Sequence, residues 1–429
     1  MTQNSVVREA PASPVFDHHS EDFARHWPEI TAHLRSTVGP VVRTEVHGGY
    51  YAVIGHPEAL AAANDAETLM SGRRDGVSSI YFPSMPLRMV PLEVDAPLQV
   101  AIRRVLNPIF SDRMAESWEP YVRQLVDVHI DQFIESGEGD LVLDLARRVT
   151  ATTNLALVGV TEFDEVEEFI DAPGITLRTE PGSPEYERAV EVSRNVEALF
   201  LQGLAERRAQ PQNDVMSVIA NLKLDGEGAT DEFILRLIHT VVSGGNSTTT
   251  SLIGHAFIWL SEHPDIREKV SGDDALLADL LEEIVRLSTP AISLGRTARA
   301  DGMVGDQPIS AGDHVLLCYG AANRDPAVFE NPDEVVFGRS ENHLAFGWGR
   351  HRCLGRSFAR SMAKATVGRV LERIPDFTVD VAAVKRYQTI PVVNGVLSVP
   401  ATFTPGARVG AVKPTETPQL PARSLGATR

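Results

Sequence analysis

The stretch Phe346–Gly355 reads Phe-Gly-Trp-Gly-Arg-His-Arg-Cys-Leu-Gly and holds Cys353, one of the chain's 2 cysteines. Gly347 and Gly349 permit a tight loop whose backbone can approach a ligand closely. Apolar and small residues recur at helical spacing from Ser357 onward, so Cys353 lies where a glycine-rich loop opens a helix. Unpaired N–H groups, the helix dipole and neighbouring arginines all lower a thiol pKa. We therefore predict a thiolate at Cys353.

A thiolate at the start of a helix could be a nucleophile, a redox sensor or a metal ligand. A nucleophile needs a nearby base, and His351 is a candidate. A redox sensor needs a resolving cysteine, but Cys318 lies in the apolar run His314–Tyr319 and is more typical of an inert buried thiol. The residues alone leave the three roles open.

A long helix is predicted between a cap at Thr230 and a stop at Pro264. Its apolar halves are separated by Ser243-Gly-Gly-Asn-Ser-Thr-Thr-Thr250. Gly244 and Gly245 each cost roughly 0.5–1 kcal/mol relative to alanine inside a helix. Such local conflicts mark functional sites, here a gap that admits a ligand. The alternative is that small residues allow close helix packing.

The cysteine loop resembles the haem-binding signature Phe-Gly-x-Gly-x-His-x-Cys-x-Gly of the cytochrome P450 family, with every signature position filled. Three further segments resemble the family in the right order: Asp95–Arg103, Glu283-Ile-Val-Arg286 and Ala321–Pro326. The resemblance spans roughly residues 20 to 402. It implies haem b, with the Cys353 thiolate as the axial ligand of the iron.

The resemblance also implies which side chains surround the haem. Arg103, Arg296 and His351 would hold the propionates, while Gln99 stands where the family has a histidine and offers a hydrogen bond without charge. Glu283, Arg286 and Arg339 would form a buried structural site, although by itself a Glu-x-x-Arg spacing also fits a solvated ion pair. The implied cofactor contacts are Cys353, His351, Arg296, Arg103, Gln99, Phe346, Gly347, Gly355, Gly244 and Gly245.

The family's pattern in the long helix is Ala/Gly-Gly-x-Asp/Glu-Thr, and here the acid position is Ser247. An acid–alcohol pair normally relays protons to iron-bound dioxygen. A shifted register, with Asn246 in the acid position, also lacks an acid. We therefore take Thr248 and Ser247 as the catalytic residues, with protons delivered through Thr248 and ordered water or aided by a polar group of the substrate.

The irregular segment 70–91 is rich in hydrophobic residues, which either pack poorly or face a ligand, and the resemblance implies that this segment roofs the substrate pocket. Because the expected lining is mostly apolar, the substrate should be an apolar small molecule of terpenoid, steroid, fatty acid or polyketide type, met in secondary or catabolic metabolism. The predicted lining is Ile80, Tyr81, Phe82, Met85, Leu87, Val241, Val242, Ala291, Ile292, Leu294, Ile390 and Val392.

Composition narrows the class of protein. The formal charge of -18 argues against nucleic-acid binding, and 2 cysteines cannot make a disulfide framework, which favours a reducing cytoplasm. The first residues lack an apolar run, and no later segment has the ~18 apolar residues of a membrane span, so no membrane anchor is expected.

Electrons are expected from a separate ferredoxin or flavodoxin-type donor with its reductase, since no flavin or iron–sulfur segment is apparent. An acidic donor would suit a basic patch, although scattered solvated arginines fit the same residues. The patch would comprise Arg104, Arg113, Arg350, Arg352, Arg356 and Arg360.

The fold class that the resemblance implies is mainly α with a small β region (α+β), with haem between the long central helix and the cysteine loop. Residues 1–20 are expected to be a flexible segment, 21–404 a single haem-thiolate monooxygenase domain and 405–429 a proline-containing flexible tail. Because Ser247 replaces the usual acid, peroxide-driven oxidation or oxidative coupling on the same fold is an alternative. A non-catalytic haem protein that binds ligands is a third.

Overall fold

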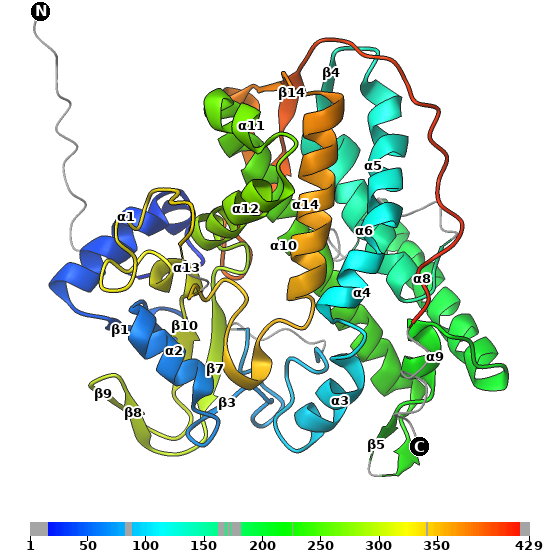
Figure 1. The fold of residues 1–429 in the computed structure, drawn as a ribbon. Coiled ribbons are helices and arrows are strands. Elements are labelled where there is room, and N and C mark those ends of the chain that lie inside the picture. Colours follow the sequence, from blue (N-terminus) through cyan, green and yellow to red (C-terminus); the bar gives the residue numbers. More distant parts are fainter. Residues whose placement is uncertain are drawn as a thin grey trace, which may run out of the picture.

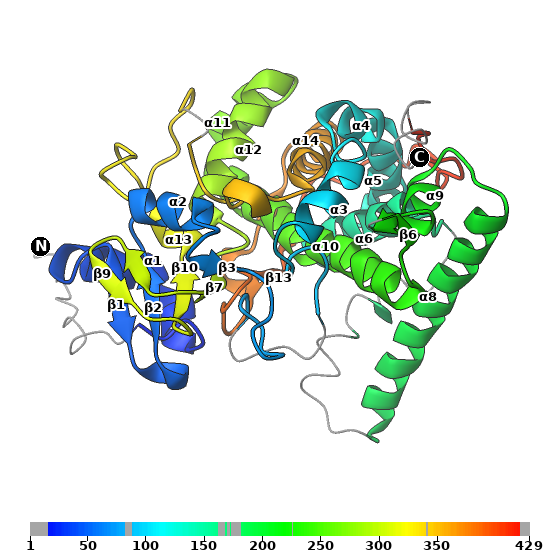
Figure 2. The same ribbon diagram turned by 90° about the horizontal axis from the view of Figure 1, so that it is seen from below.

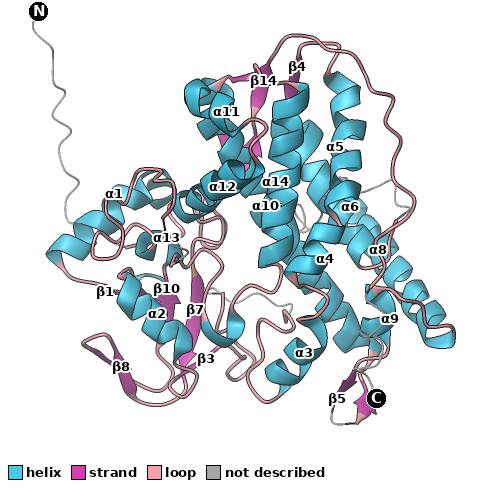
Figure 3. Ribbon diagram, viewed as in Figure 1, coloured by secondary structure: helices cyan, strands magenta, loops and turns pink. Residues whose placement is uncertain are grey.

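The computed structural model describes residues 16–81, 88–161, 168–169, 172, 182–224, 226–339 and 342–420. A helix-rich body lies beside a smaller part that holds the five-stranded sheet (Figures 1 and 3). The predicted mainly α architecture with a small β region is confirmed. No helix among the described residues is both long and apolar enough to cross a membrane.

The body is built around α10 (Asp231–Glu262), which crosses the middle of the molecule (Figure 2). Thr230 caps α10 as predicted, because its side chain accepts a hydrogen bond from the Phe233 N–H. The neighbours of α10 include α6 (Arg147–Leu157), α12 (Asp274–Ser288) and α14 (Arg356–Arg373). The other helices of the body are α3 (Leu98–Leu106), α4 (Asp112–Ser117), α5 (Glu119–Phe133), α8 (Pro184–Ala209), α9 (Val215–Ala220) and α11 (Pro264–Val270).

Helix α6 continues a turn of π-helix over Leu141–Ala146, so the helical hydrogen bonding changes where α6 begins. Asp140 accepts hydrogen bonds from the N–H groups of Val142 and Leu143 and starts this turn.

The strand-rich part holds a five-stranded sheet in the order β1-β2-β10-β7-β3. β1 and β2 form an antiparallel hairpin around a short 3-10 turn, while β10 pairs with β2 in parallel and with β7 in antiparallel orientation. The strands are β1 (Val41–Thr44), β2 (Tyr50–Val53), β3 (Leu69–Met70), β7 (Leu294–Ala298) and β10 (His314–Leu317).

The strand pleat sends neighbouring residues to opposite faces of this sheet. Val42 and Leu316 pack in one cluster with Trp27 of α1 (Glu21–Thr37), whereas Val41 and Val315 pack in another with Ala59 and Ala62 of α2 (His56–Asn64). The sheet is therefore covered on both faces. The short α13 (Tyr319–Ala322) follows β10 directly.

The remaining strands form small sheets. β11 and β4 flank β14, while β5 pairs with β6, β8 with β9 and β12 with β13. Their bounds are β4 (Glu138–Asp140), β5 (Lys223–Leu224), β6 (Glu227–Gly228), β8 (Gly302–Val304), β9 (Gln307–Ile309), β11 (Thr378–Val379), β12 (Lys385–Arg386), β13 (Val396–Ser398) and β14 (Pro400–Thr402).

Residues 405–420 run down the outside of the body past α5 (red in Figure 1). The Asp131 carboxylate of α5 accepts hydrogen bonds from the N–H groups of Val409, Gly410 and Ala411. Further along, Leu420 is only 3% exposed and joins the main core. The predicted flexibility of residues 405–429 stays a prediction, and the described part of this segment is held at these points.

The expected flexible start of the chain also stays a prediction for residues 1–15, which lie outside the described part. Phe16 is 1% exposed and packs against Phe23 of α1, and Ser20 caps that helix through the Phe23 N–H.

Candidate active site

The cysteine loop owes its shape to two glycines. Gly347 has φ 62° and Gly349 φ 67°, a left-handed conformation that other residues rarely adopt. A Cβ at Gly349 would also collide with the carbonyl oxygen of Ala63. The Cys353 N–H donates to the Phe346 carbonyl oxygen at 2.7 Å and closes the loop. Cys353 therefore has a fixed backbone position just before α14.

Burial of Cys353 raises the pKa of its thiol. The Gly355 N–H and the positive charges of Arg103 and Arg356 lower this pKa, as predicted, but burial has the larger effect. Without a bound metal, desolvation therefore penalises the charged form of Cys353, and the predicted thiolate stays a prediction for the isolated chain. A bound metal cation reverses this balance, since cysteine binds metals as the thiolate.

Cys318 is buried, and burial raises the pKa of its thiol as well. This location agrees with an inert core cysteine.

Arg296 and Arg103, from two other elements, lie at the cysteine loop, which itself contains His351. Arg296 of β7 is 4% exposed and donates to the Gly295 carbonyl oxygen at 2.7 Å. Arg103 of α3 donates to the Arg352 carbonyl oxygen at 2.8 Å. Burial, together with the charge of Arg296, lowers the pKa of His351 to about 3, so its imidazole is neutral at pH 7.

The two arginines of this cluster form no ion pair within the part of the chain that the structure describes. Among the described residues, no carboxylate lies within 4 Å of the guanidinium of Arg103 or Arg296. Asp95 lies 3.9 Å from His351, which is too long for a hydrogen bond. Because a buried cation without an anion is costly, the cluster fits an anionic ligand such as the propionates of haem.

Gln99, which replaces the family's histidine, serves the loop itself. It is 2% exposed, and its amide donates to the Arg350 carbonyl oxygen at 2.6 Å. One helical turn later, Arg103 holds the Arg352 carbonyl in the same way. The two side chains of α3 thus fasten the backbone on both sides of His351.

The paired glycines of α10 have separate roles. A Cβ at Gly244 would meet nothing within 4 Å, whereas a Cβ at Gly245 would lie 2.8 Å from the Asn154 side chain of α6. The Asn154 amide donates to the Asn246 side-chain oxygen at 2.7 Å in the interior. Gly245 is therefore needed for close helix packing, and Gly244 leaves open space. Asn246 is bound to α6, which argues against the shifted register.

The open face of α10 carries hydroxyl groups. Gly244 and Ser243 are exposed, and Thr240, Ser247 and Thr248 are partly exposed. The hydroxyls of Thr240, Ser243 and Thr248 donate to the carbonyl oxygens four residues earlier, at 2.8, 2.6 and 2.7 Å. These hydroxyls therefore present lone pairs to the open side.

The predicted valines lie elsewhere on α10. Val242 is 1% exposed in the main core, and Val241 packs against the same core. Val242 is therefore a core residue in this structure and not an open lining, while the place of partly exposed Val241 in the pocket lining stays a prediction. Sequence reasoning missed Thr240 and Ser243, although their spacing to Ser247 and Thr248 follows one helix face.

The other predicted lining residues fall into three groups. Phe82, Met85 and Leu87 lie outside the described residues. Tyr81, Ala291, Leu294 and Val392 are partly exposed. Ile80, Ile292 and Ile390 are only 1%, 3% and 2% exposed, so in this structure they are core residues and not an open lining.

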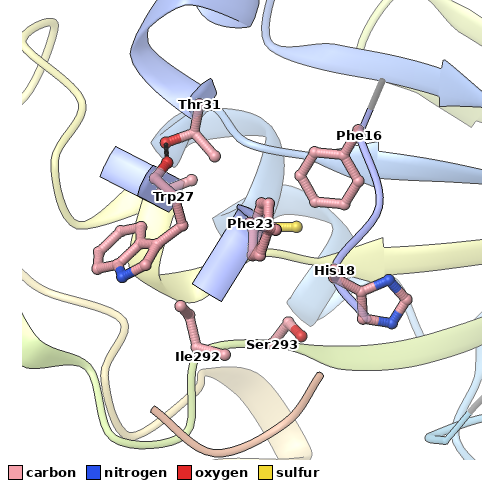
Figure 4. Close-up of a pocket in the computed structure, with 9 residues that line it drawn as sticks. Phe16, His18, Phe23, Trp27, Thr31, Ile292 and Ser293 are labelled. Carbon is pink, nitrogen blue, oxygen red and sulfur yellow. Dashed lines mark hydrogen bonds between the residues drawn. The ribbon is translucent and has the colours of Figure 1, made fainter. Parts of the chain in front are cut away.

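Ile292 and Ile390 belong to the cluster that packs under α1. Figure 4 shows Ile292 beside a cavity that Phe23, Trp27 and Thr31 of α1 also line. The cavity measures about 10 Å³, room for roughly one water molecule. It is too small to be a substrate site.

The structure brings Glu283, Arg286 and Arg339 together. Arg286 is 0% exposed and its Nε lies 2.8 Å from one carboxylate oxygen of Glu283, while the Arg339 Nε lies 3.0 Å from the other. Arg286 also donates to the carbonyl oxygens of Asn323 and Glu334. This site ties α12 to the segment that precedes the cysteine loop.

The predicted basic patch is smaller than expected. Arg104, Arg113 and Arg350 are exposed, but Arg352, Arg356 and Arg360 are partly buried. Arg360 is paired with Glu282, which offsets its charge.

Residues 183–402 match the family model described as cytochrome P450. The chain is 31% identical to cytochrome P450 130 of Mycobacterium tuberculosis, over 77% of this chain and 83% of the relative. It is also 31% identical to cytochrome P450-terp of a Pseudomonas species, over 72% and 75% of the two chains.

Solved structures agree with the sequence relatives. CYP108D1 from Novosphingobium aromaticivorans superposes with a TM-score of 0.79 at 25% identity, covering 91% of this chain and 99% of that chain. Cytochrome P450 CYP109Q5 from Chondromyces apiculatus gives 0.78 at 26%, covering 92% and 100%. The chain belongs to the cytochrome P450 family, whose members are monooxygenases that bind haem through a cysteine thiolate to the iron.

Proposed function

We propose that Cys353 holds the iron of haem b and that Arg296, Arg103 and His351 hold its propionates. The observation that carries this proposal is the pair of arginines beside the cysteine loop, buried Arg296 and half-buried Arg103, neither of which has a carboxylate within 4 Å among the described residues. When bound, haem supplies the activation of dioxygen. Arg296 and Arg103 would then neutralise the propionates, and neutral His351 would donate one hydrogen bond.

The residues of α10 would handle protons on the other side of the haem. Thr248 donates to the Gly244 carbonyl at 2.7 Å, so its oxygen can accept a hydrogen bond from ordered water. Ser247 can hold a second water, but neither side chain is an acid. Proton delivery therefore depends on water or on a polar group of the substrate.

The substrate we infer is a mostly apolar small molecule of terpenoid, steroid, fatty acid or polyketide type that carries a hydrogen-bond donor. Partly exposed Leu294 and Val392 support the apolar part. The oxygens of Thr240 and Ser243 supply acceptors on the open face of α10, which a hydroxyl or amine group would meet. Insertion of one oxygen atom from dioxygen into such a molecule would suit a role in secondary or catabolic metabolism.

Electrons would come from an acidic ferredoxin or flavodoxin-type protein with its reductase. Exposed Arg104, Arg113 and Arg350 support docking of an acidic partner on an otherwise acidic protein. Two free cysteines support a reducing cytoplasm as the location.

Peroxide-driven oxidation or oxidative coupling is a second candidate, favoured by Ser247 in the position of the acid. Product formation distinguishes this candidate from the monooxygenase when purified holoprotein is supplied either with peroxide alone or with a redox partner and dioxygen. Product formed only with peroxide would replace the monooxygenase proposal. A bound haem without product under either supply would favour a ligand-binding protein.

The first experiment is an optical titration of the ferric holoprotein with apolar compounds in matched pairs, with and without a hydroxyl or amine. A saturable shift toward high-spin haem with one chemical class identifies the substrate type. If the compound with the hydroxyl or amine binds more tightly, and Ser243→Ala abolishes that difference, the result supports a hydrogen bond from the substrate to the hydroxyl face of α10. Equal binding of both members would contradict that part of the proposal.

A further inference from the structure

A second glutamate of α12, Glu282, holds its own partly buried cluster next to the Glu283 site. The Glu282 carboxylate accepts the His343 Nε2–H at 2.6 Å and the Arg360 Nε–H at 2.8 Å, and a second guanidinium nitrogen of Arg360 also bonds it. The side chains of Glu282, His343 and Arg360 are 16%, 4% and 30% exposed. This cluster is separate from the contacts of Glu283.

The cluster reaches the cysteine loop from both ends. Before the loop, the Nδ1 of His343 accepts the Ala345 N–H at 3.2 Å, which fixes the proton on Nε2, where Glu282 binds it. After the loop, Arg360 projects from α14, and its guanidinium lies 4.6 Å from the centre of the Phe346 ring. The Phe346 carbonyl in turn accepts the Cys353 N–H at 2.7 Å. Glu282 therefore joins the entry and exit of the loop.

The cluster also sets the charge near the sulfur. The guanidinium of Arg360 lies against Phe346, whose carbonyl oxygen binds the Cys353 N–H, so its positive charge is placed beside the cysteine loop. Burial raises the pKa of Glu282, but hydrogen bonds from Arg360 and His343 outweigh it and bring the pKa to about 2. Glu282 is therefore ionised at neutral pH and offsets the charge of Arg360.

We propose that Glu282 and Arg360 are positioning residues that set the reduction potential of the haem iron from opposite directions. The inference rests on the proposed function of Cys353 as the iron ligand. One-electron reduction, with the electron supplied by the redox partner, adds negative charge at the iron and thiolate. A nearby cation stabilises the reduced form, and a nearby anion opposes it. Arg360 thus raises the reduction potential, and Glu282 lowers it.

The test is a mediated spectroelectrochemical titration of holoprotein. Glu282→Gln keeps the side-chain shape but removes one negative charge beside Arg360, so the potential should rise. Arg360→Gln removes the cation, so the potential should fall. The potential of the double variant should be close to that of the wild type. Glu282→Asp, which keeps the charge, should also have the wild-type potential.

Asp127→Asn is the matched control. The Asp127 side chain is also 16% exposed and bonds two arginines of α14, Arg369 at 2.8 Å and Arg373 at 2.6 Å. Arg369 lies nine residues beyond Arg360, about 13 Å further along the helix. This variant should leave the potential unchanged.

A merely structural role predicts loosening in both variants, with shifts of the same sign or none. That result, with a thiolate spectrum intact, would overturn the proposal while leaving the assignment of Cys353. If Glu282→Gln does not retain haem, the comparison of Arg360→Gln with the charge-keeping Arg360→Lys decides the matter, since only the first should lower the potential. A wild-type protein without thiolate-bound haem would overturn both proposals.

Discussion

At the scale of single residues, Cys353 is where burial and positive charge act against each other. The arginines and the loop N–H groups were readable from the sequence, and they do lower the thiol pKa. The burial that outweighs them comes from the packing of the loop against other elements, which no local spacing reports. A thiolate at this position therefore depends on the arrival of a metal cation.

Thr248 is the residue whose hydroxyl should matter most for coupling electrons to product. In Thr248→Ala the oxygen that accepts a hydrogen bond from water is lost, so protons arrive less effectively at the open face of α10. We expect a lower yield of product per electron, with more peroxide released, and thermal stability close to the wild type. The measurement is product and peroxide per reduced cofactor consumed. An unchanged yield would show that Thr248 has no part in proton delivery.

At the scale of elements, the two glycines of α10 offer a matched pair of substitutions. Gly245→Ala places a methyl group 2.8 Å from Asn154 and should destabilise the protein by about 1–3 kcal/mol. Gly244→Ala meets no atom within 4 Å and should keep or slightly raise stability, by up to ~1 kcal/mol. Denaturant unfolding measures both free energies. A reversed order would contradict the assignment of Gly245 to packing and Gly244 to the open side.

Elements with strong local signals were predictable. Thr230 and Pro264 set the ends of α10, and the hairpin of β1 and β2 follows from alternation around a glycine turn. The turn of π-helix before α6 carries no such signal. On α10, the apolar spacing identified the buried side. Thr240 and Ser243 were missed because they lie outside the glycine-containing motif from which Ser247 and Thr248 were predicted.

At the scale of the whole molecule, the segment 405–420 fastens distant parts of the fold. Its proline content predicted a flexible tail, and the pattern could not reveal that Asp131 of α5 offers its carboxylate to three successive N–H groups. Beyond these, Leu420 enters the core beside Asn213 of the α8–α9 connection.

Asp131→Asn should release this segment, because an amide is a weaker acceptor and also loses the charged bond to Arg373. The expected loss is about 1–3 kcal/mol of unfolding free energy, with faster hydrogen exchange at residues 409–411. Burial raises the pKa of Asp131, but the hydrogen bonds from Arg373 and from the N–H groups of residues 409–411 outweigh burial, so the net pKa is lowered. A lowered folded pKa gives stability at neutral pH that is lost on acidification, so the variant should lose this part of the acid dependence. Unchanged exchange would mean that other contacts hold the segment.

The charge distribution of the molecule predicts how an electron donor docks. Arg104→Glu with Arg350→Glu reverses two exposed charges near the cysteine loop and should slow reduction by an acidic donor at low salt. The same reversal at Arg25, an exposed residue of α1, is the control. Stopped-flow reduction across a salt series measures the rate. An equal effect of both changes would place docking elsewhere.

The central claim, that Cys353 binds haem iron, is tested most directly by the spectrum of the reduced protein with carbon monoxide. Wild type and Cys318→Ser should show the red-shifted band of thiolate ligation, because Cys318 is a buried core residue. Cys353→Ser should lose that band or lose the haem. A thiolate band that persists in Cys353→Ser, or that disappears in Cys318→Ser with haem retained, would contradict the account.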